Sequence, residues 1–164
     1  MILDVAQELA KALVSRRISL VTAESCTAGL VAASLAELSG ASAYLWGGFI
    51  CYSNEAKVGQ LGVDPEVLEQ KGAVSREAAL AMAEGALHAS GATLAVSVTG
   101  LAGPEGDGSG VPVGTVWIAT ALAGAEPFAI VRRYAGDRNE VRVRATLDAL
   151  GDAVRRLDTT ATLS

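Results

Sequence analysis

The sequence contains one histidine and two cysteines. Cys26 and Cys51 are not spaced as a C-x-x-C pair, so they indicate neither a metal site nor a disulfide framework, and a reduced compartment fits them best. A lone His88 without an acidic cluster at ligand spacing argues against a protein-held zinc ion. It also argues against a serine–histidine–aspartate triad, unless His88 itself is the base. We expect no metal and no cofactor, and interpret His88 as a surface residue or a partner of its helix dipole.

Basic residues and long apolar runs are also scarce. The 13 Lys and Arg stand against 18 Asp and Glu, which argues against a protein that wraps nucleic acid or binds an anionic membrane. Asp4 and Glu8 interrupt the N-terminal pattern, so we predict neither a signal peptide nor a membrane span, and expect a cytoplasmic protein. Arginines nevertheless gather after Val131. They either hold a small anionic ligand or form a solvated helix face with its own salt bridges.

Small apolar residues dominate the composition, with 51% hydrophobic residues, 18 Gly and 4% aromatics. This composition suits a tightly packed α/β core, and the length predicts a single domain over residues 1–164. We expect strands at 18–22, 44–52 and 93–98, followed by a hairpin of 114–122 and 128–134. Helical patterns lie at 2–13 and up to 38 from a cap at Ser25 or Thr27. Ser53 or Asn54 can cap a short helix to about 60, Pro65 begins another near Asp64, and Ser75 caps a helix that ends at Gly91. A last helix begins near 137, and we expect a frayed tail beyond Asp158. The order predicts a three-layer α/β/α sandwich with a mixed sheet.

The segment from Gly40 to Lys57 is the first candidate active site. Its aromatic, β-branched middle predicts a buried strand, with Ser42 in a small-residue turn before it and Lys57 at the start of a helix after it. A helix N-terminus and burial both lower the pKa of a lysine, and a neutral lysine can take the proton of a serine nucleophile. Tyr52 would donate a proton or a hydrogen bond. The alternative is a serine in a turn and a lysine on a helix without shared function.

A second candidate is the strand-to-helix turn A-E-S-C-T-A-G, residues 23–29. Such a turn exposes unpaired N–H groups that suit an anion or an oxyanion. Ser25 is therefore a rival nucleophile, although the turn is not G-x-S-x-G and the strained-elbow argument does not transfer. Glu24, Ser25 and Thr27 instead could orient ligand hydroxyls. Cys26 as the nucleophile has no partner histidine.

The glycine-rich segment from Gly100 to Gly114 has no G-K-[ST] and leads into a strand rather than a helix. It is therefore neither a P-loop nor a dinucleotide fingerprint. Its length is typical of a functional or mobile loop.

Six motifs in order make the chain similar to the CinA C-terminal domain family. They are T-A-E-S-C-T-A-G (22–29), G-F-I-C-Y-S-N-E-A-K (48–57), G-A-V-S (72–75), S-V-T-G-L-A-G-P (97–104), P-V-G-T-V-W (112–117) and G-D-R (136–138). They span almost the whole chain, which resembles the stand-alone form of the family. The family includes nicotinamide-nucleotide amidases, so the resemblance implies hydrolysis of nicotinamide mononucleotide to nicotinate mononucleotide and ammonia in pyridine-nucleotide salvage.

The resemblance also implies site residues. The family's catalytic serine, lysine and supporting tyrosine fall on Ser42, Lys57 and Tyr52, and Ser25 stays open as the alternative nucleophile. Substrate contacts fall on the motif positions Gly48, Thr99, Gly100, Gly103 and Arg138. Arg142, one helical turn after Arg138, would help to hold the 5′-phosphate. Two alternatives stay open, a ligand-binding or regulatory module without activity and a hydrolase of another small amide. We expect a homo-oligomer.

Overall fold

A computed structural model of the chain describes residues 1–161 and contains one mixed sheet of five strands in the order β2-β1-β3-β4-β5. The strands are β1 (Leu20–Glu24), β2 (Leu45–Ile50), β3 (Leu94–Gly100), β4 (Thr115–Leu122) and β5 (Phe128–Arg133). Strands β2, β1 and β3 are parallel, β4 runs antiparallel to β3, and β5 runs antiparallel to β4. The predicted mixed sheet and terminal hairpin are confirmed.

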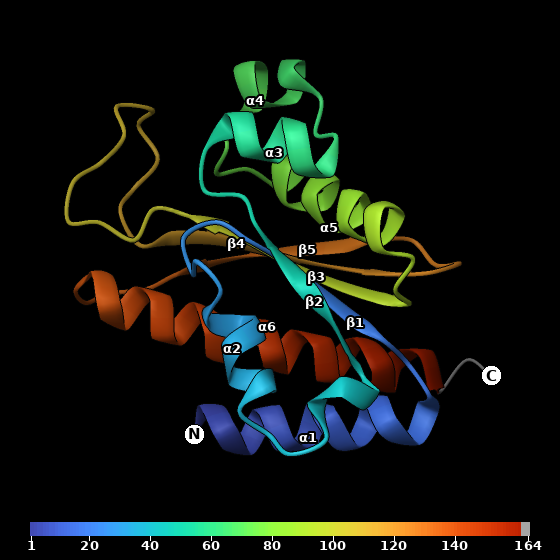
Figure 1. Cartoon of the computed structure of the whole chain (residues 1–164). Coiled ribbons are helices and arrows are strands. Elements are labelled where there is room, and N and C mark those ends of the chain that lie inside the picture. The colour runs from blue at the N-terminus through green and yellow to red at the C-terminus, as the bar shows by residue number, and fades with distance from the viewer. Residues whose placement is uncertain (162–164) are drawn as a thin grey trace.

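Helices cover both faces of the sheet (Figure 1). They are α1 (Ile2–Arg16), α2 (Leu30–Ala36), α3 (Asn54–Leu61), α4 (Pro65–Lys71), α5 (Arg76–Ser90) and α6 (Arg138–Ala161), with a short 3-10 helix η1 at Ala41–Ala43. Helix α5 lies on one face, and α3 and α4 pack on its outer side. Helices α2 and α6 lie on the other face, with α1 packed against both. The predicted α/β/α sandwich is confirmed, with α1 and the α3–α4 pair added outside it.

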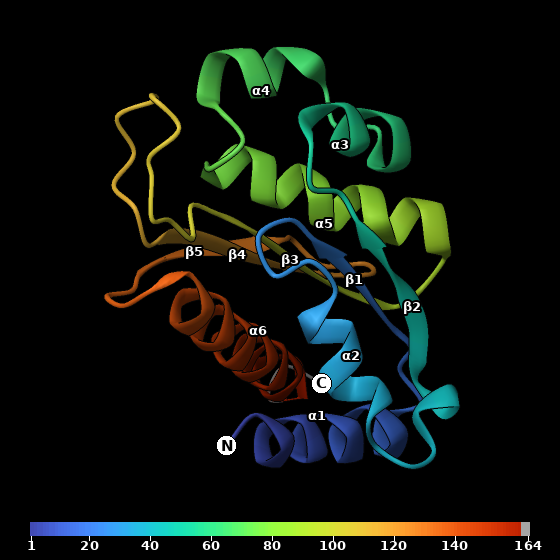
Figure 2. The same ribbon diagram turned by 60° about the vertical axis from the view of Figure 1, so that its left-hand side comes forward.

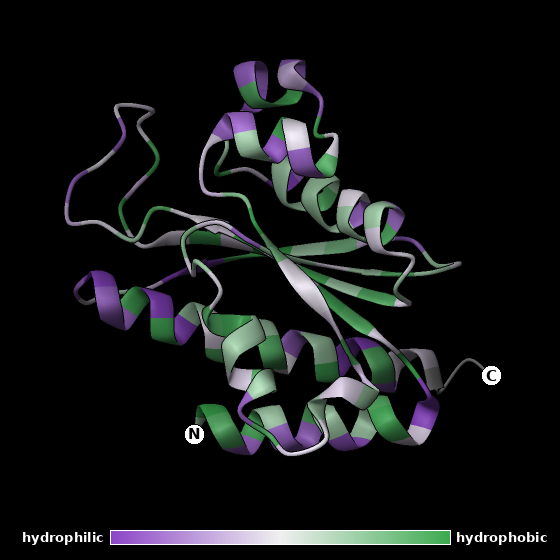
Figure 3. Ribbon diagram, in the orientation of Figure 1, coloured by the Kyte–Doolittle hydropathy of each residue, from purple (hydrophilic) through white to green (hydrophobic). Residues whose placement is uncertain are grey.

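Two hydrophobic clusters flank the sheet, because successive residues of the central strands point to opposite faces. Leu94, Val96 and Val98 of β3 join the cluster under α1, α2 and α6. Val21 and Ala23 of β1 join the cluster under α5. In Figure 3 hydrophobic colours follow the strands, and hydrophilic colours mark α4 and the first turns of α6. Within residues 1–161 no helix combines the length and apolar composition needed to cross a membrane.

Three predicted helix starts are confirmed, two at a predicted cap and one at Pro65. Ser53, Asp64 and Ser75 each accept a hydrogen bond from an N–H in the first turn of α3, α4 and α5. One prediction is wrong, because helix α2 has Gly29, not Ser25 or Thr27, at its N-cap. Helix α6 continues to Ala161, and residues 162–164 lie outside the described residues. Fraying beyond Asp158 stays a prediction.

The carboxyl ends of β1, β2 and β3 meet at one edge of the sheet. The chain leaves β1 through α2 on one face, and leaves β2 through α3, α4 and α5 on the other. Open α/β sheets bind ligands at such a switch between faces, outside the carboxyl ends of the strands. The β3–β4 loop and the start of α6 lie at the same edge, which is on the left in Figure 1 and can be followed again in Figure 2.

Candidate active site

A cavity of about 200 Å³ opens at the carboxyl edge of the parallel strands. It is lined by residues that follow β1 and β2, by the end of β3 and the β3–β4 loop, by the connection between α4 and α5, and by the first residue of α6. These residues are Ser25, Cys26, Tyr52, Asn54, Lys57, Ala73, Val74, Thr99, Gly100, Leu101, Ala102, Gly103, Glu105, Asp107 and Arg138. The cavity thus joins segments from five of the six motifs, although these motifs lie far apart in the sequence.

Lys57 and Ser25 form a hydrogen-bonded pair in the floor of this cavity. The Lys57 Nζ atom lies 3.1 Å from Ser25 Oγ, 3.1 Å from the Cys51 carbonyl oxygen and 3.3 Å from that of Tyr52. Lys57 is 1% exposed and Ser25 is 7% exposed. Lys57 Nζ donates to Ser25 Oγ and to both carbonyl oxygens, and the Ser25 hydroxyl donates to the Tyr52 carbonyl oxygen at 3.4 Å. A lysine amine that has lost one proton keeps two N–H bonds and gains a lone pair, which can accept the proton of the Ser25 hydroxyl.

Burial lowers the pKa of Lys57, because an ammonium ion in the cavity floor loses its hydration. The side chain forms no ion pair with any acidic group of residues 1–161 that would offset this loss. The predicted lowering of this pKa by burial is therefore confirmed in direction. The site contains the components of a serine nucleophile with a lysine base.

The predicted pairing of Lys57 with Ser42 is wrong. Ser42 is exposed in η1, which precedes β2, whereas Lys57 follows β2 and contacts carbonyls beyond its carboxyl end. The six residues of β2 span roughly 20 Å at about 3.3 Å per residue. The serine that meets Lys57 comes instead from the end of β1, because β1 and β2 pair in parallel with Glu24 opposite Ile50.

The turn that carries Ser25 has an unusual backbone. Ala28 has φ 50°, and Gly29 has φ 97°. A left-handed conformation costs a residue with a Cβ about 1–2 kcal/mol, so the surrounding contacts must hold this turn in place.

The Glu24 carboxylate is one of these contacts. It is fully buried and accepts hydrogen bonds from the Thr27 hydroxyl and from the N–H groups of Gly29, Val31 and Ala32 at 2.6–3.1 Å. Glu24 thereby replaces the predicted side-chain cap of α2 and complements the helix dipole. Neither Glu24 nor Thr27 lines the cavity. This geometry differs from the prediction that both orient ligand hydroxyls, since each side chain is already bonded within the turn.

Two predicted arginines lie on α6 but have different surroundings. Arg138 is at the cavity, where it donates to the Gly103 carbonyl at 2.7 Å and to the Tyr52 hydroxyl oxygen at 2.5 Å. Arg142 is half-buried behind the Ser25 turn and donates to the carbonyls of Cys26 and Thr27. The structure therefore brings Arg138 to the site and turns Arg142 away from the cavity, in contrast to the prediction that they act together on one phosphate.

The remaining predicted contacts divide in the same way. Thr99 lines the cavity with Gly100 and Gly103, and its hydroxyl donates to the Ala73 carbonyl at 2.7 Å. Gly48 does not line it and lies within β2 opposite Thr22. A Cβ at Gly48 would come within 2.4 Å of Thr22 Oγ1, so this glycine permits close packing of β2 on β1.

Cys26 and His88 lack the setting of catalytic groups. Burial raises the pKa of the Cys26 thiol to about 11, so it stays protonated and weakly nucleophilic at neutral pH. His88 is exposed in the last turn of α5 and does not line this cavity.

Two acids of the β3–β4 loop, Glu105 and Asp107, line the cavity and were not predicted from the sequence. A glycine-rich loop has no periodic pattern from which the positions of its side chains could be inferred.

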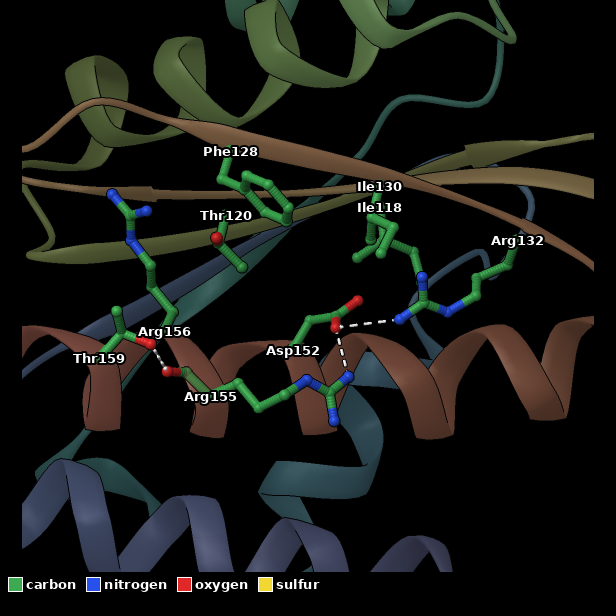
Figure 4. Close-up of a pocket in the computed structure, with 9 residues that line it drawn as sticks. All are labelled: Ile118, Thr120, Phe128, Ile130, Arg132, Asp152, Arg155, Arg156 and Thr159. Carbon is green, nitrogen blue, oxygen red and sulfur yellow. Dashed lines mark hydrogen bonds and ion pairs between the residues drawn. The ribbon is translucent and has the colours of Figure 1, made fainter.

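A larger cavity of about 380 Å³ lies between α6 and the β4–β5 hairpin (Figure 4). Its apolar wall includes Phe128 and Ile130. Of its charged groups, Asp152 pairs with both Arg132 and Arg155. These ion pairs agree with the interpretation of the C-terminal arginines as a helix face with its own salt bridges. This cavity contains no nucleophile paired with a base, so the chemistry favours the smaller one.

The chain belongs to the CinA C-terminal domain family, whose model matches residues 3–157. It is 44% identical over 149 residues to the nicotinamide-nucleotide amidohydrolase PncC of Escherichia coli K12, which covers 91% of this chain and 90% of that protein. A protein of the same name from Enterobacter agglomerans is 42% identical over 152 residues, with 93% of each covered.

Longer relatives and solved structures agree with this assignment. The chain spans about a third of a CinA-like protein of Geotalea daltonii, to which it is 50% identical over 136 residues that cover 82% of this chain and 32% of the relative. A crystal structure of a CinA superfamily protein from Klebsiella pneumoniae matches with a TM-score of 0.94 at 34% identity, covering 97% of this chain and 99% of that one. A competence/damage-inducible protein from Agrobacterium tumefaciens matches with a TM-score of 0.91 at 40% identity, covering 96% and 95%.

Proposed function

We propose that the protein is a nicotinamide-nucleotide amidase, which hydrolyses the carboxamide of nicotinamide mononucleotide to nicotinate mononucleotide and ammonia in pyridine-nucleotide salvage. The observation that carries the proposal is the buried contact of 3.1 Å between Lys57 Nζ and Ser25 Oγ. The similarity to proteins named nicotinamide-nucleotide amidohydrolase supports the substrate. Ser25 replaces Ser42 as the nucleophile in this proposal.

Acyl transfer begins when neutral Lys57 takes the hydroxyl proton of Ser25 and Ser25 Oγ attacks the carboxamide carbon. The carbonyl oxygen becomes an oxyanion. Its proposed backbone donor is the N–H of Cys26, the residue directly after the nucleophile, which lines the cavity. No protein oxygen among residues 1–161 accepts a hydrogen bond from this N–H.

The tetrahedral intermediate collapses when the C–N bond breaks and Lys57 returns its proton to the leaving nitrogen, which departs as ammonia. Lys57 is then neutral again and takes a proton from water as the water attacks the ester carbon. Collapse of this second intermediate releases the carboxylic acid product and restores the Ser25 hydroxyl. One lysine thus serves as base and acid in both halves of the reaction.

Arg138 is the proposed ligand of the 5′-phosphate. Besides Lys57, it is the basic side chain that lines the cavity within residues 1–161, and it is exposed at the mouth. Its guanidinium can exchange its bonds to Gly103 and Tyr52 for a bidentate contact with phosphate. Tyr52, which is 56% exposed, and Thr99 are proposed to contact the ribose or the ring.

We also propose that the protein is a cytoplasmic homo-oligomer. Its two cysteines are buried and free, which suits a reducing compartment. The edge strand β2 exposes Trp46 and Ile50 without a charged residue, and such an edge favours pairing with another chain. A monomeric mass in light scattering at micromolar concentration would contradict the assembly, and a membrane or extracellular fraction would contradict the location.

The activity is tested by incubating the native chain with nicotinamide mononucleotide and quantifying ammonia and nicotinate mononucleotide. We expect the two products in equal amounts. Binding of the mononucleotide without turnover between about pH 6 and 9 would overturn the activity in favour of a binding module. Turnover of other small amides, with the mononucleotide inert, would overturn the substrate and retain the hydrolase.

A further inference from the structure

Arg142 has no role in the proposed reaction, yet its side chain binds the backbone of the turn that carries Ser25. Its Nε atom donates to the Cys26 carbonyl at 3.0 Å, and one terminal nitrogen donates to the Thr27 carbonyl at 3.1 Å. The side chain is half-buried and forms no ion pair among residues 1–161. A guanidinium that could pair with a carboxylate is here committed to two successive carbonyls of the turn that carries Ser25.

These two bonds fix the orientation of the turn. A trans peptide directs its C=O and its N–H to opposite sides, so a held carbonyl also sets the adjacent N–H. Arg142 holds the carbonyls of Cys26 and Thr27, and the Ala28 N–H holds the carbonyl of Ser25 at 3.1 Å. Three consecutive peptides are therefore fixed, including the one that ends in the Cys26 N–H.

The turn needs such support, because Ala28 takes a left-handed conformation that costs about 1–2 kcal/mol. Glu24 binds the N–H groups on one side of the turn, and Arg142 binds the carbonyls on the other. The planar fork of arginine suits two neighbouring acceptors, which the single ammonium of a lysine cannot match.

We infer that Arg142 is a positioning residue for the reaction, which holds the Ser25 turn so that Ser25 Oγ stays on Lys57 and the Cys26 N–H stays in place for the oxyanion. The inference rests on the proposed function in that it takes Ser25 as the nucleophile. It does not depend on which amide is the substrate.

The test compares the native chain with Arg142→Ala, Arg142→Lys and the control Arg144→Ala. Arg144 also lies on α6 and also donates to a backbone carbonyl, that of Ala135, but it is exposed and away from the cavity. We measure kcat and KM with nicotinamide mononucleotide, and the melting temperature of each variant. Loss of one oxyanion donor typically lowers kcat about 100- to 1000-fold. We therefore expect Arg142→Ala to lower kcat about 100-fold with KM changed by less than about threefold, Arg142→Lys to lie between, and Arg144→Ala to match the native chain.

A second readout is the rate at which a fluorophosphonate labels Ser25, followed by peptide mass spectrometry. The phosphonyl oxygen needs the same donor, so we expect labelling of Arg142→Ala to slow in parallel with kcat. Arg142→Lys keeps the charge and the length of the side chain, and carries the test if the alanine variant does not fold.

The outcomes separate this inference from the function. A rise in KM at constant kcat for Arg142→Ala would make Arg142 a substrate ligand and overturn the inference. A lower melting temperature with native kcat and native labelling would reduce it to a structural contact and also overturn it. Labelling of native Ser25 without turnover of the mononucleotide would overturn the substrate, while the labelling rates still decide the role of Arg142. Native protein that neither labels nor turns over would end both proposals.

Discussion

Lys57→Met is the substitution that most directly probes the buried amine. Lys57 is 1% exposed and has its pKa lowered by burial, so it loses its proton in the folded chain at a lower pH than in the unfolded chain, where its value is near 10.5. Between these two pKa values the unfolded chain binds more protons than the folded one. The free energy of unfolding therefore rises with pH across this window, and the burial penalty is fully present below it.

The size of the effect follows from one proton. The free energy of unfolding of the native chain should rise, relative to that of Lys57→Met, by up to about 1.4 kcal/mol per pH unit inside the window. Methionine has a similar length and no titrating group, so its curve lacks this rise. Urea denaturation of both proteins from about pH 6 to 10 measures the difference, and the contributions of all other titrating groups cancel to first order.

The proposed catalysis needs Lys57 without its proton, so kcat/KM should rise as the pH passes through the pKa that Lys57 has in the folded chain. Lys11→Met is the matched control, because Lys11 is exposed on α1 and away from the cavity, and we expect this variant to keep the rise that Lys57 gives the native chain. A constant difference between the native chain and Lys57→Met across this range would refute the reasoning, since it would mean that the folded state does not lower the pKa of Lys57.

Three further substitutions test the packing and the site. Gly48→Ala should lower the free energy of unfolding by about 1–3 kcal/mol in urea, because its Cβ would meet Thr22 Oγ1, whereas Gly59→Ala, in an open position on α3, should be neutral or stabilising. An unchanged Gly48→Ala would contradict the close contact. Glu24→Gln should cost about 1–3 kcal/mol by the same assay, because an amide nitrogen cannot accept from the N–H groups of α2, and native stability would show that the cap is dispensable. Arg138→Ala should raise KM for the mononucleotide at least about tenfold with a smaller change in kcat, and an unaltered KM would remove Arg138 as the phosphate ligand.

Local patterns were sufficient for most of the fold. Apolar runs located the central strands, and the capping residues Ser53, Asp64 and Ser75 located three helix starts, because both signals depend on neighbours in the sequence. The burial of Lys57 also followed from the strand beside it.

The partner of Lys57 could not be predicted from the same patterns. Ser42 and Ser25 both sit in small-residue turns, and only the parallel pairing of β1 with β2 decides which hydroxyl reaches the lysine. That pairing joins residues far apart in the chain and leaves Ser42 at the opposite end of β2.

The roles of Glu24 and Arg142 escaped prediction for a related reason. Both side chains bind backbone groups of the turn that carries Ser25. Those groups come within reach only when Ala28 and Gly29 take their left-handed conformations. From the sequence alone, a charged residue near a candidate site is predicted to contact the ligand, because the backbone groups that it binds instead are not known.

The most direct measurement of the central claim is ammonia release by Ser25→Ala and Ser42→Ala under identical conditions. A serine that forms the covalent intermediate contributes several orders of magnitude to kcat. We predict that Ser25→Ala loses at least about 1000-fold in kcat and that Ser42→Ala stays within about twofold of the native chain. Native turnover by Ser25→Ala, or loss of activity in Ser42→Ala alone, would contradict the assignment of Ser25 and Lys57 as nucleophile and base.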